Sequence, residues 1–182
     1  MKNNKGLSLI ELMITVAIAA ILLTVGAPGI QSILQQNRVI AATNDISSVI
    51  RTARFTAIDQ EQLTILCPTS DYDACGTDWT LAKMVFIDAN SNGSRDANET
   101  LIQSTDPLGS GLEIAGIKTA LSFSPDGSVS TAATITLCPA SGDATAASAV
   151  IVSLYGRVAV AKDSNNNGIK EDSSGSDLSC GS

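Results

Sequence analysis

The chain has 182 residues, of which 44% are apolar and only 3% aromatic, and its formal net charge is −7. This length accommodates one ordinary domain plus an anchor or tail, and the acidity argues against a general nucleic-acid binder because phosphate binding rests on Lys and Arg. The sequence contains no histidine, the commonest general base and metal ligand, so we expect no enzymatic activity.

The sequence begins with a short basic leader and a long apolar stretch. Lys2 and Lys5 precede residues 7–27, which carry a single charge, Glu11. A helix rising about 1.5 Å per residue over this length matches a hydrocarbon core of about 30 Å, and short basic flanks stay cytoplasmic. A secretory signal peptide has a shorter apolar stretch, and a plain anchor leaves Glu11 unexplained, because a carboxylate is costly in lipid without a partner. We therefore predict a transmembrane helix over 7–27, with the rest of the chain outside the cytoplasm.

The helix is predicted to continue over residues 28–60 as an amphipathic segment. Gly26 and Pro28 are expected to loosen the backbone at the junction, since proline removes a helix hydrogen bond. Beyond them, apolar residues recur at three- and four-residue steps and predict one core-facing stripe. The stripe comprises Ile30, Ile33, Leu34, Ala41, Ile46, Val49, Ile50, Ala53 and Ala57.

Residues 61–162 change to short β-type runs separated by turn signals, which predict an antiparallel β head. A long N-terminal helix packed on such a head is an α+β fold. The polar residues 163–182 are predicted to be a coil. The expected strands are 63–67, 84–88, 100–103, 112–117, 121–124, 134–138 and 149–155.

Two further patterns concern cysteine and acidic residues. The four cysteines all follow the apolar stretch and predict two disulfides in an exported domain, although four cysteines allow three pairings. Residues 88–99 fit the twelve-position EF-hand calcium loop, but strands flank it, so a polar hairpin loop is the alternative. A second loop from Asp163 begins the same way, but Ser174 stands at its twelfth position. The calcium ligands of the first loop would be Asp88, Asn90, Asn92, the Ser94 carbonyl, Asp96 and Glu99.

The run from Gly6 to Met13, Gly-Leu-Ser-Leu-Ile-Glu-Leu-Met, resembles the type III signal of type IV pilins and type II secretion pseudopilins. The resemblance implies that a prepilin peptidase removes residues 1–6 and methylates the amine of Leu7, where the family usually has Phe. It also implies that Glu11 pairs with the freed amine of a neighbouring subunit, and that Pro28 matches a helix-loosening proline of the family.

The head resembles FimT/FimU-type minor pilins and GspH-type pseudopilins. The motifs that carry this resemblance are Ala53–Ile58 with Leu63–Cys67, Trp79 with Met84–Asn90, Phe123–Gly127, Thr136–Cys138 and Gly156–Val158. It implies the pairings Cys67–Cys75 and Cys138–Cys180, the second of which ties down the tail.

The implied function is that of a minor pilin, a structural subunit that helps to prime or cap a type IV pilus. The alternative is an H-type pseudopilin of the type II secretion system. Either would be anchored in the bacterial inner membrane with a periplasmic head, and would assemble with other pilins or pseudopilins. DNA capture is disfavoured, because Arg157 follows Gly156 as in a Gly-Arg-x-Arg motif but Ala159 replaces the second arginine. No cofactor is required, and calcium is the one candidate.

Overall fold

We describe the fold from a computed structural model, which covers residues 8–181 and, at residues 25–28, the backbone alone. The chain divides into one unit that ends at Gln35 and a second that starts at Gln36. The elements in chain order are α1 (Leu9–Gln60), β1 (Thr64–Thr69), β2 (Ala82–Ile87), β3 (Leu101–Ser104), β4 (Leu112–Ala115), β5 (Leu121–Phe123), β6 (Ala133–Pro139), the short 3-10 helix η1 (Ala144–Ala146), β7 (Ser148–Val152) and β8 (Val158–Val160).

Helix α1 runs without interruption through residue 28. The loosening expected at Pro28 therefore does not break the helix. The helix ends where Glu61 adopts a φ of 53°, the left-handed conformation that commonly terminates helices. The chain then turns directly into β1.

Only the later part of the predicted apolar stripe faces a core. Residues from Ile46 to Ala57 in the stripe are buried, whereas Ile30, Ile33, Leu34 and Ala41 are exposed. The prediction was wrong at Ala41. The buried face of the helix begins at Val39, and because an α-helix has 3.6 residues per turn, the side chain two positions later, that of Ala41, points to the opposite side. The first three residues belong to the unit that precedes the head.

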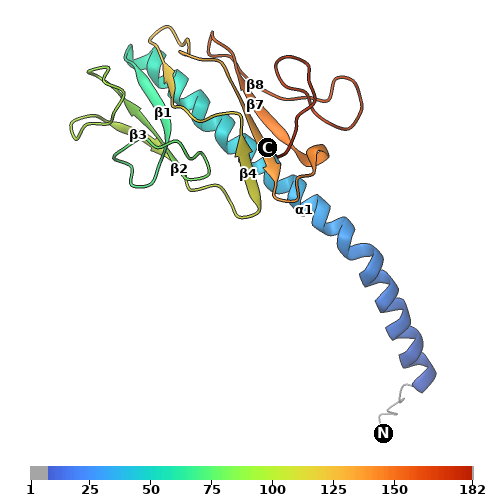
Figure 1. Cartoon of the computed structure of the whole chain (residues 1–182). Coiled ribbons are helices and arrows are strands. Elements are labelled where there is room, and N and C mark those ends of the chain that lie inside the picture. Colours follow the sequence, from blue (N-terminus) through green and yellow to red (C-terminus); the bar gives the residue numbers. More distant parts are fainter. Residues whose placement is uncertain (1–7, 182) are drawn as a thin grey trace. The chain divides into compact units, whose positions relative to one another are not determined.

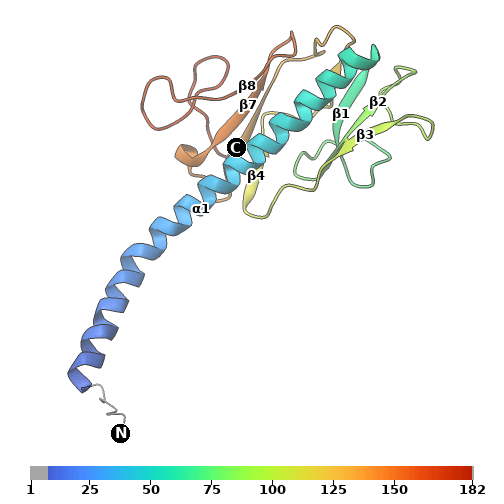
Figure 2. The same cartoon turned by 180° about the vertical axis from the view of Figure 1, so that it is seen from behind.

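The head contains two four-stranded antiparallel sheets, with strand orders β3-β2-β1-β5 and β4-β6-β7-β8. The C-terminal part of α1 lies along both of them (Figures 1 and 2). This arrangement confirms the predicted α+β class. Strand β8 was not predicted, because Val158-Ala159-Val160 is too short a run to stand out after the turn at Gly156.

Each sheet buries one face against α1 and covers the other with irregular chain. Leu66 and Val85 of the first sheet and Ile135 and Leu137 of the second pack with the helix in the main core. The opposite faces form two smaller cores. The outer core of the first sheet contains Ile65, Cys67, Met84 and Phe86, packed with Tyr72 and Cys75, and that of the second contains Cys138, Ala147, Ala149, Ala161 and Leu178, packed with Ile169 and Cys180.

A disulfide joins the covering segment to the sheet on each outer face. Cys67 is bonded to Cys75, and Cys138 to Cys180, which are the pairs that the family resemblance implies. The described part of the tail, residues 163–181, contains no named strand, as expected of a coil, but it packs on the head. Leu178 is 5% exposed.

Gly156 permits a close approach between two turns at one end of the head. Its φ is +69°, and a Cβ there would overlap the carbonyl oxygen of Gly127. We expect Gly156→Ala to destabilise the chain by more than about 1 kcal/mol in urea unfolding. Gly142→Ala is the matched control, because Gly142 has a similar φ of +74° but open space around it. Equal losses in the two variants would contradict a role for the close approach.

Candidate assembly surface

The first part of α1 is an apolar helix whose described side chains, those of residues 9–24, are all exposed. It belongs to the one helix among residues 8–181 that is long and apolar enough to cross a membrane by length and composition. Its side chains are exposed around the whole circumference, for example Leu9 at 79% and Leu23 at 70%. The hydroxyls of Thr15 and Thr24 donate to helix carbonyls three residues earlier, so they do not require water as a partner. The segment can therefore bury its surface in lipid or against other helices.

Glu11 closes a capping box at the start of this helix. The Ser8 backbone N–H donates to Oε2 of Glu11 at 2.9 Å, and the Glu11 N–H donates to the Ser8 hydroxyl oxygen at 3.3 Å. Two donors of the first turn, which the helix itself leaves unpaired, are thus satisfied. The box was not predicted, although its sequence signal, Ser-x-x-Glu before an apolar run, is present at Ser8 and Glu11. The carboxylate still has acceptor capacity for a further donor.

The other predicted processing and assembly residues are only partly described. Gly6 and Leu7 lie outside the described residues, and at Pro28 only the backbone is described. Their roles in cleavage, methylation and assembly stay predictions.

The predicted calcium loop is tightly ordered by its own hydrogen bonds. Asp88, which is 1% exposed, accepts from the N–H groups of Asn92 and Gly93 at 3.1 and 2.8 Å. Glu99 accepts from the N–H groups of Ala89 and Asp96. Further bonds join the amides of Asn90 and Asn92 to Asp96, and the N–H of Ser94 to Asn92. These bonds order the loop from within.

The second loop repeats this pattern. Asp163 accepts from the N–H groups of Asn167 and Gly168, and the buried Glu171 accepts from those of Ser164 and Asn165. Glu171 thus accepts backbone N–H groups of the second loop as Glu99 does in the first. Asp172, the next residue, accepts from the N–H groups of Ser174 and Ser176.

Calcium binding stays a prediction for the first loop. Across residues 8–181, no three His, Cys, Asp or Glu residues are grouped so as to hold a metal ion. Because backbone donors already satisfy the carboxylates, we expect the unfolding temperature of the chain to be the same in EDTA as in buffer. A fall in EDTA would show that the fold requires a cation. A calorimetric titration that stays flat at millimolar calcium would reject binding.

Arg157 lies exposed in the tight turn between β7 and β8. Its backbone N–H donates to the Ser153 hydroxyl, and its carbonyl accepts from the Ser153 N–H. Two helix arginines come close to the same turn: Arg51 donates to the Val158 carbonyl, and Arg54 donates to the Gly127 carbonyl beside Gly156. Arg51 and Arg54 are more than 100 positions from Arg157 in the sequence, so only the fold brings them near this turn.

An exposed apolar helix with a carboxylate in its first turn, continuing into a disulfide-bonded head of two antiparallel sheets, defines a pilin-like subunit. Residues 42–156 match the family described as Type II transport protein GspH, and residues 1–27 match the Prokaryotic N-terminal methylation motif. The chain belongs to the GspH family. The resemblance to minor pilins and pseudopilins is thereby confirmed, and the chain carries the methylation signal of such subunits.

Solved structures show the same fold at low sequence identity. The type IV minor pilin FimU of Pseudomonas aeruginosa is 17% identical, with a TM-score of 0.56 over 69% of this chain and 90% of FimU. The minor pseudopilin EpsH of the Vibrio cholerae Type 2 Secretion System is 15% identical, with a TM-score of 0.50 over 68% of this chain and 95% of EpsH. No curated protein matches the sequence.

Proposed function

We propose that this chain is a minor pilin, a non-enzymatic subunit that enters a type IV pilus and helps to prime or cap its assembly. The observation that carries the proposal is the apolar first part of α1, which is exposed all round and has Glu11 as its one charged residue before Arg38. Such a helix requires lipid before assembly and other helices afterwards. Glu11 supplies the polar group that selects one register among those helices.

In this proposal a prepilin peptidase cuts between Gly6 and Leu7 and methylates Leu7, while the subunit is anchored in the inner membrane. The head would be periplasmic, where both disulfides are stable. The partners would be other pilins, packed through α1. The alternative, an H-type pseudopilin of type II secretion, uses the same features inside the cell envelope.

Mechanical shearing of cells separates the two. A pilus subunit is expected in the sheared surface filaments together with the other pilins. Recovery only from the membrane fraction, while other pilins are sheared off, would reject the pilus and favour the secretion system. Retention of residues 1–6 by the membrane-bound chain would reject processing in both cases.

A second candidate function is DNA capture, favoured by one observation. Arg51, Arg54 and Arg157 approach the same turn, in which Tyr155 is 86% exposed. The net charge of −7 opposes it, and Arg51 and Arg54 already donate to carbonyls. A gel shift that weakens with salt and is abolished by Arg157→Ala would support DNA binding, whereas absence of a shift at low salt would reject it.

A further inference from the structure

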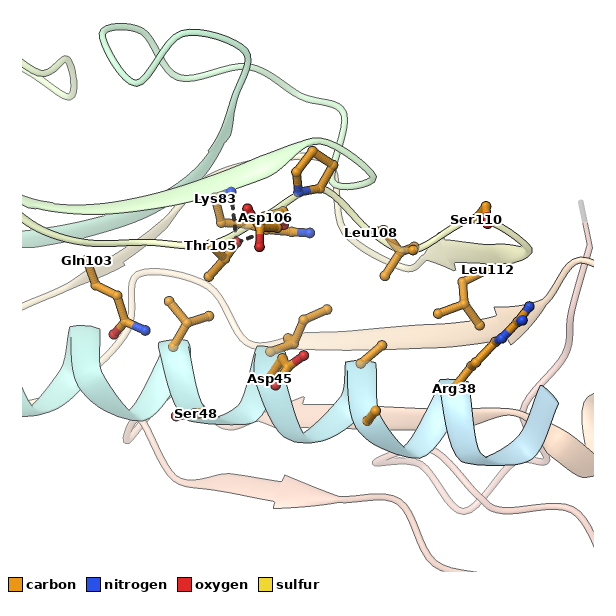
Figure 3. A pocket seen from close by; sticks show the side chains of 16 residues that line it. Arg38, Asp45, Ser48, Lys83, Gln103, Thr105, Asp106, Leu108, Ser110 and Leu112 are labelled. Carbon is orange, nitrogen blue, oxygen red and sulfur yellow. Dashed lines mark hydrogen bonds between the residues drawn. The ribbon is translucent and has the colours of Figure 1, made fainter. Parts of the chain in front are cut away.

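A groove of about 620 Å³ separates α1 from the loop that follows β3. Figure 3 shows the helix residues Arg38, Asp45 and Ser48 on one side of it. The residues labelled on the other side include Thr105, Asp106, Leu108 and Ser110 of the loop and Leu112 at the start of β4. Arg38 and Val49 line its two ends on the helix side, so at about 1.5 Å per residue the groove follows the helix for about 16 Å. All the lining residues belong to the unit that begins at Gln36.

Lys83 contributes a buried cation to this groove. It lies on β2 two residues before Val85, which packs in the core against α1, so the alternation of a strand directs Lys83 to the same side. The residue is only 3% exposed. Its backbone is fixed by reciprocal bonds with Thr105: the Lys83 N–H donates to the Thr105 hydroxyl, and the Thr105 N–H donates to the Lys83 carbonyl.

The ammonium group of Lys83 has no partner within the described part of the chain. The hydrogen bonds of this residue are made by its backbone, and the ion pair found among residues 8–181 joins Arg95 to Asp73 instead. Burial lowers the pKa of Lys83, against the opposing influence of Asp78. Lys170, by contrast, donates its ammonium to the Ala147 carbonyl at 2.7 Å. Among the described residues, the buried side-chain atoms that lack a hydrogen-bond partner do not include the Lys83 ammonium, so this group opens to the solvent of the groove. An anion that reached it there would replace water with a charge-assisted hydrogen bond.

We propose that this groove receives a carboxylate side chain, Asp or Glu, on a segment of a neighbouring pilin-like subunit, and that Lys83 pairs with it. The proposal rests on the proposed function as a filament subunit. A length of about 16 Å accommodates about five residues of extended chain at 3.3 Å each. The lining is mixed, with Asp45 and Asp106 among its polar residues. Its apolar part, which includes Ala42, Ile46, Leu108 and Leu112, suits the side chains that flank an acid on a protein segment, whereas a free anion would leave that part exposed.

The test places a photocrosslinking amino acid at Ser110, an exposed residue of the groove, in the full-length chain expressed in cells that make filaments. Ser174, exposed and outside the groove, is the control position. We expect a crosslink from Ser110 to a peptide of another pilin-like subunit that contains Asp or Glu. Lys83→Glu should reduce its yield about tenfold or more, and exchange of that acid for Lys should restore it.

Lys83→Met keeps most of the buried side chain without its charge, and should lower the crosslink while the chain keeps its unfolding temperature. It therefore separates lost pairing from misfolding. An undiminished crosslink in Lys83→Met or Lys83→Glu, or no restoration by the exchanged acid, would overturn the pairing. The filament content of the wild-type chain is measured in parallel. A chain absent from filaments contradicts the proposed function, whereas a chain present without a Ser110 crosslink contradicts this groove alone.

Discussion

Replacing Glu11 by alanine is expected to leave a subunit that is still processed and membrane-bound, but that enters filaments at least about tenfold less. In the proposed assembly this carboxylate pairs with the N-terminal amine of a neighbour in a water-poor environment. Removing one partner of a buried ion pair costs about 3–5 kcal/mol, because the other charge is left uncompensated. The measurement is the ratio of the variant in sheared filaments to the variant in membranes.

The capping box requires two control variants, because Glu11 also accepts from the Ser8 N–H. Ser8→Ala removes the hydroxyl that caps the Glu11 N–H, at about 0.5–2 kcal/mol of local helix stability, and keeps the charge. It should incorporate nearly normally. Glu11→Gln keeps acceptor and shape without charge, and should fail as the alanine variant does. Normal incorporation of Glu11→Gln would contradict the pairing of this carboxylate with an amine.

Removing the Cys138–Cys180 disulfide is expected to cost about 3–4 kcal/mol of unfolding free energy. The two residues are 42 positions apart, and in the chain-entropy model a bond that closes a loop of this size strongly restricts the unfolded chain. The loss would also release the tail that covers the outer core of the second sheet, including Leu178. Urea unfolding of the full chain in detergent, with Cys138→Ala and Cys180→Ala combined, measures the effect.

The Cys67–Cys75 pair is the matched control for this prediction. Its residues are only eight positions apart, so the same model gives about 2–3 kcal/mol. We expect the Cys67→Ala, Cys75→Ala variant to unfold at a higher urea concentration than the Cys138→Ala, Cys180→Ala variant. The reverse order would show that packing around Cys67, rather than loop closure, dominates the contribution of these bonds.

Periodicity predicted the elements of the head well, because most of them bury one regular face. The helix was expected to reach residue 60 and ends at Gln60, and each of the seven expected runs overlaps an observed strand. Periodicity could not show that the strands divide into two sheets, since strand order depends on contacts distant in sequence. It also missed β8, which has only three residues.

The features of the site were predictable to different degrees. The type III signal identified Glu11 from local sequence, and the same local sequence was sufficient to predict its capping box with Ser8. The burial of Lys83 was not, because a lysine between Ala82 and Met84 looks like an ordinary exposed residue of a strand. Only the three-dimensional fold places α1 and the loop after β3 around it.

Mass spectrometry of the N-terminus in sheared filaments and in the inner-membrane fraction tests the central claim most directly. We expect a chain that begins at Leu7 with a methylated amine and is present in the filaments with other pilins. A full-length chain that begins at Met1 in the membrane, and is absent from every filament, would contradict it.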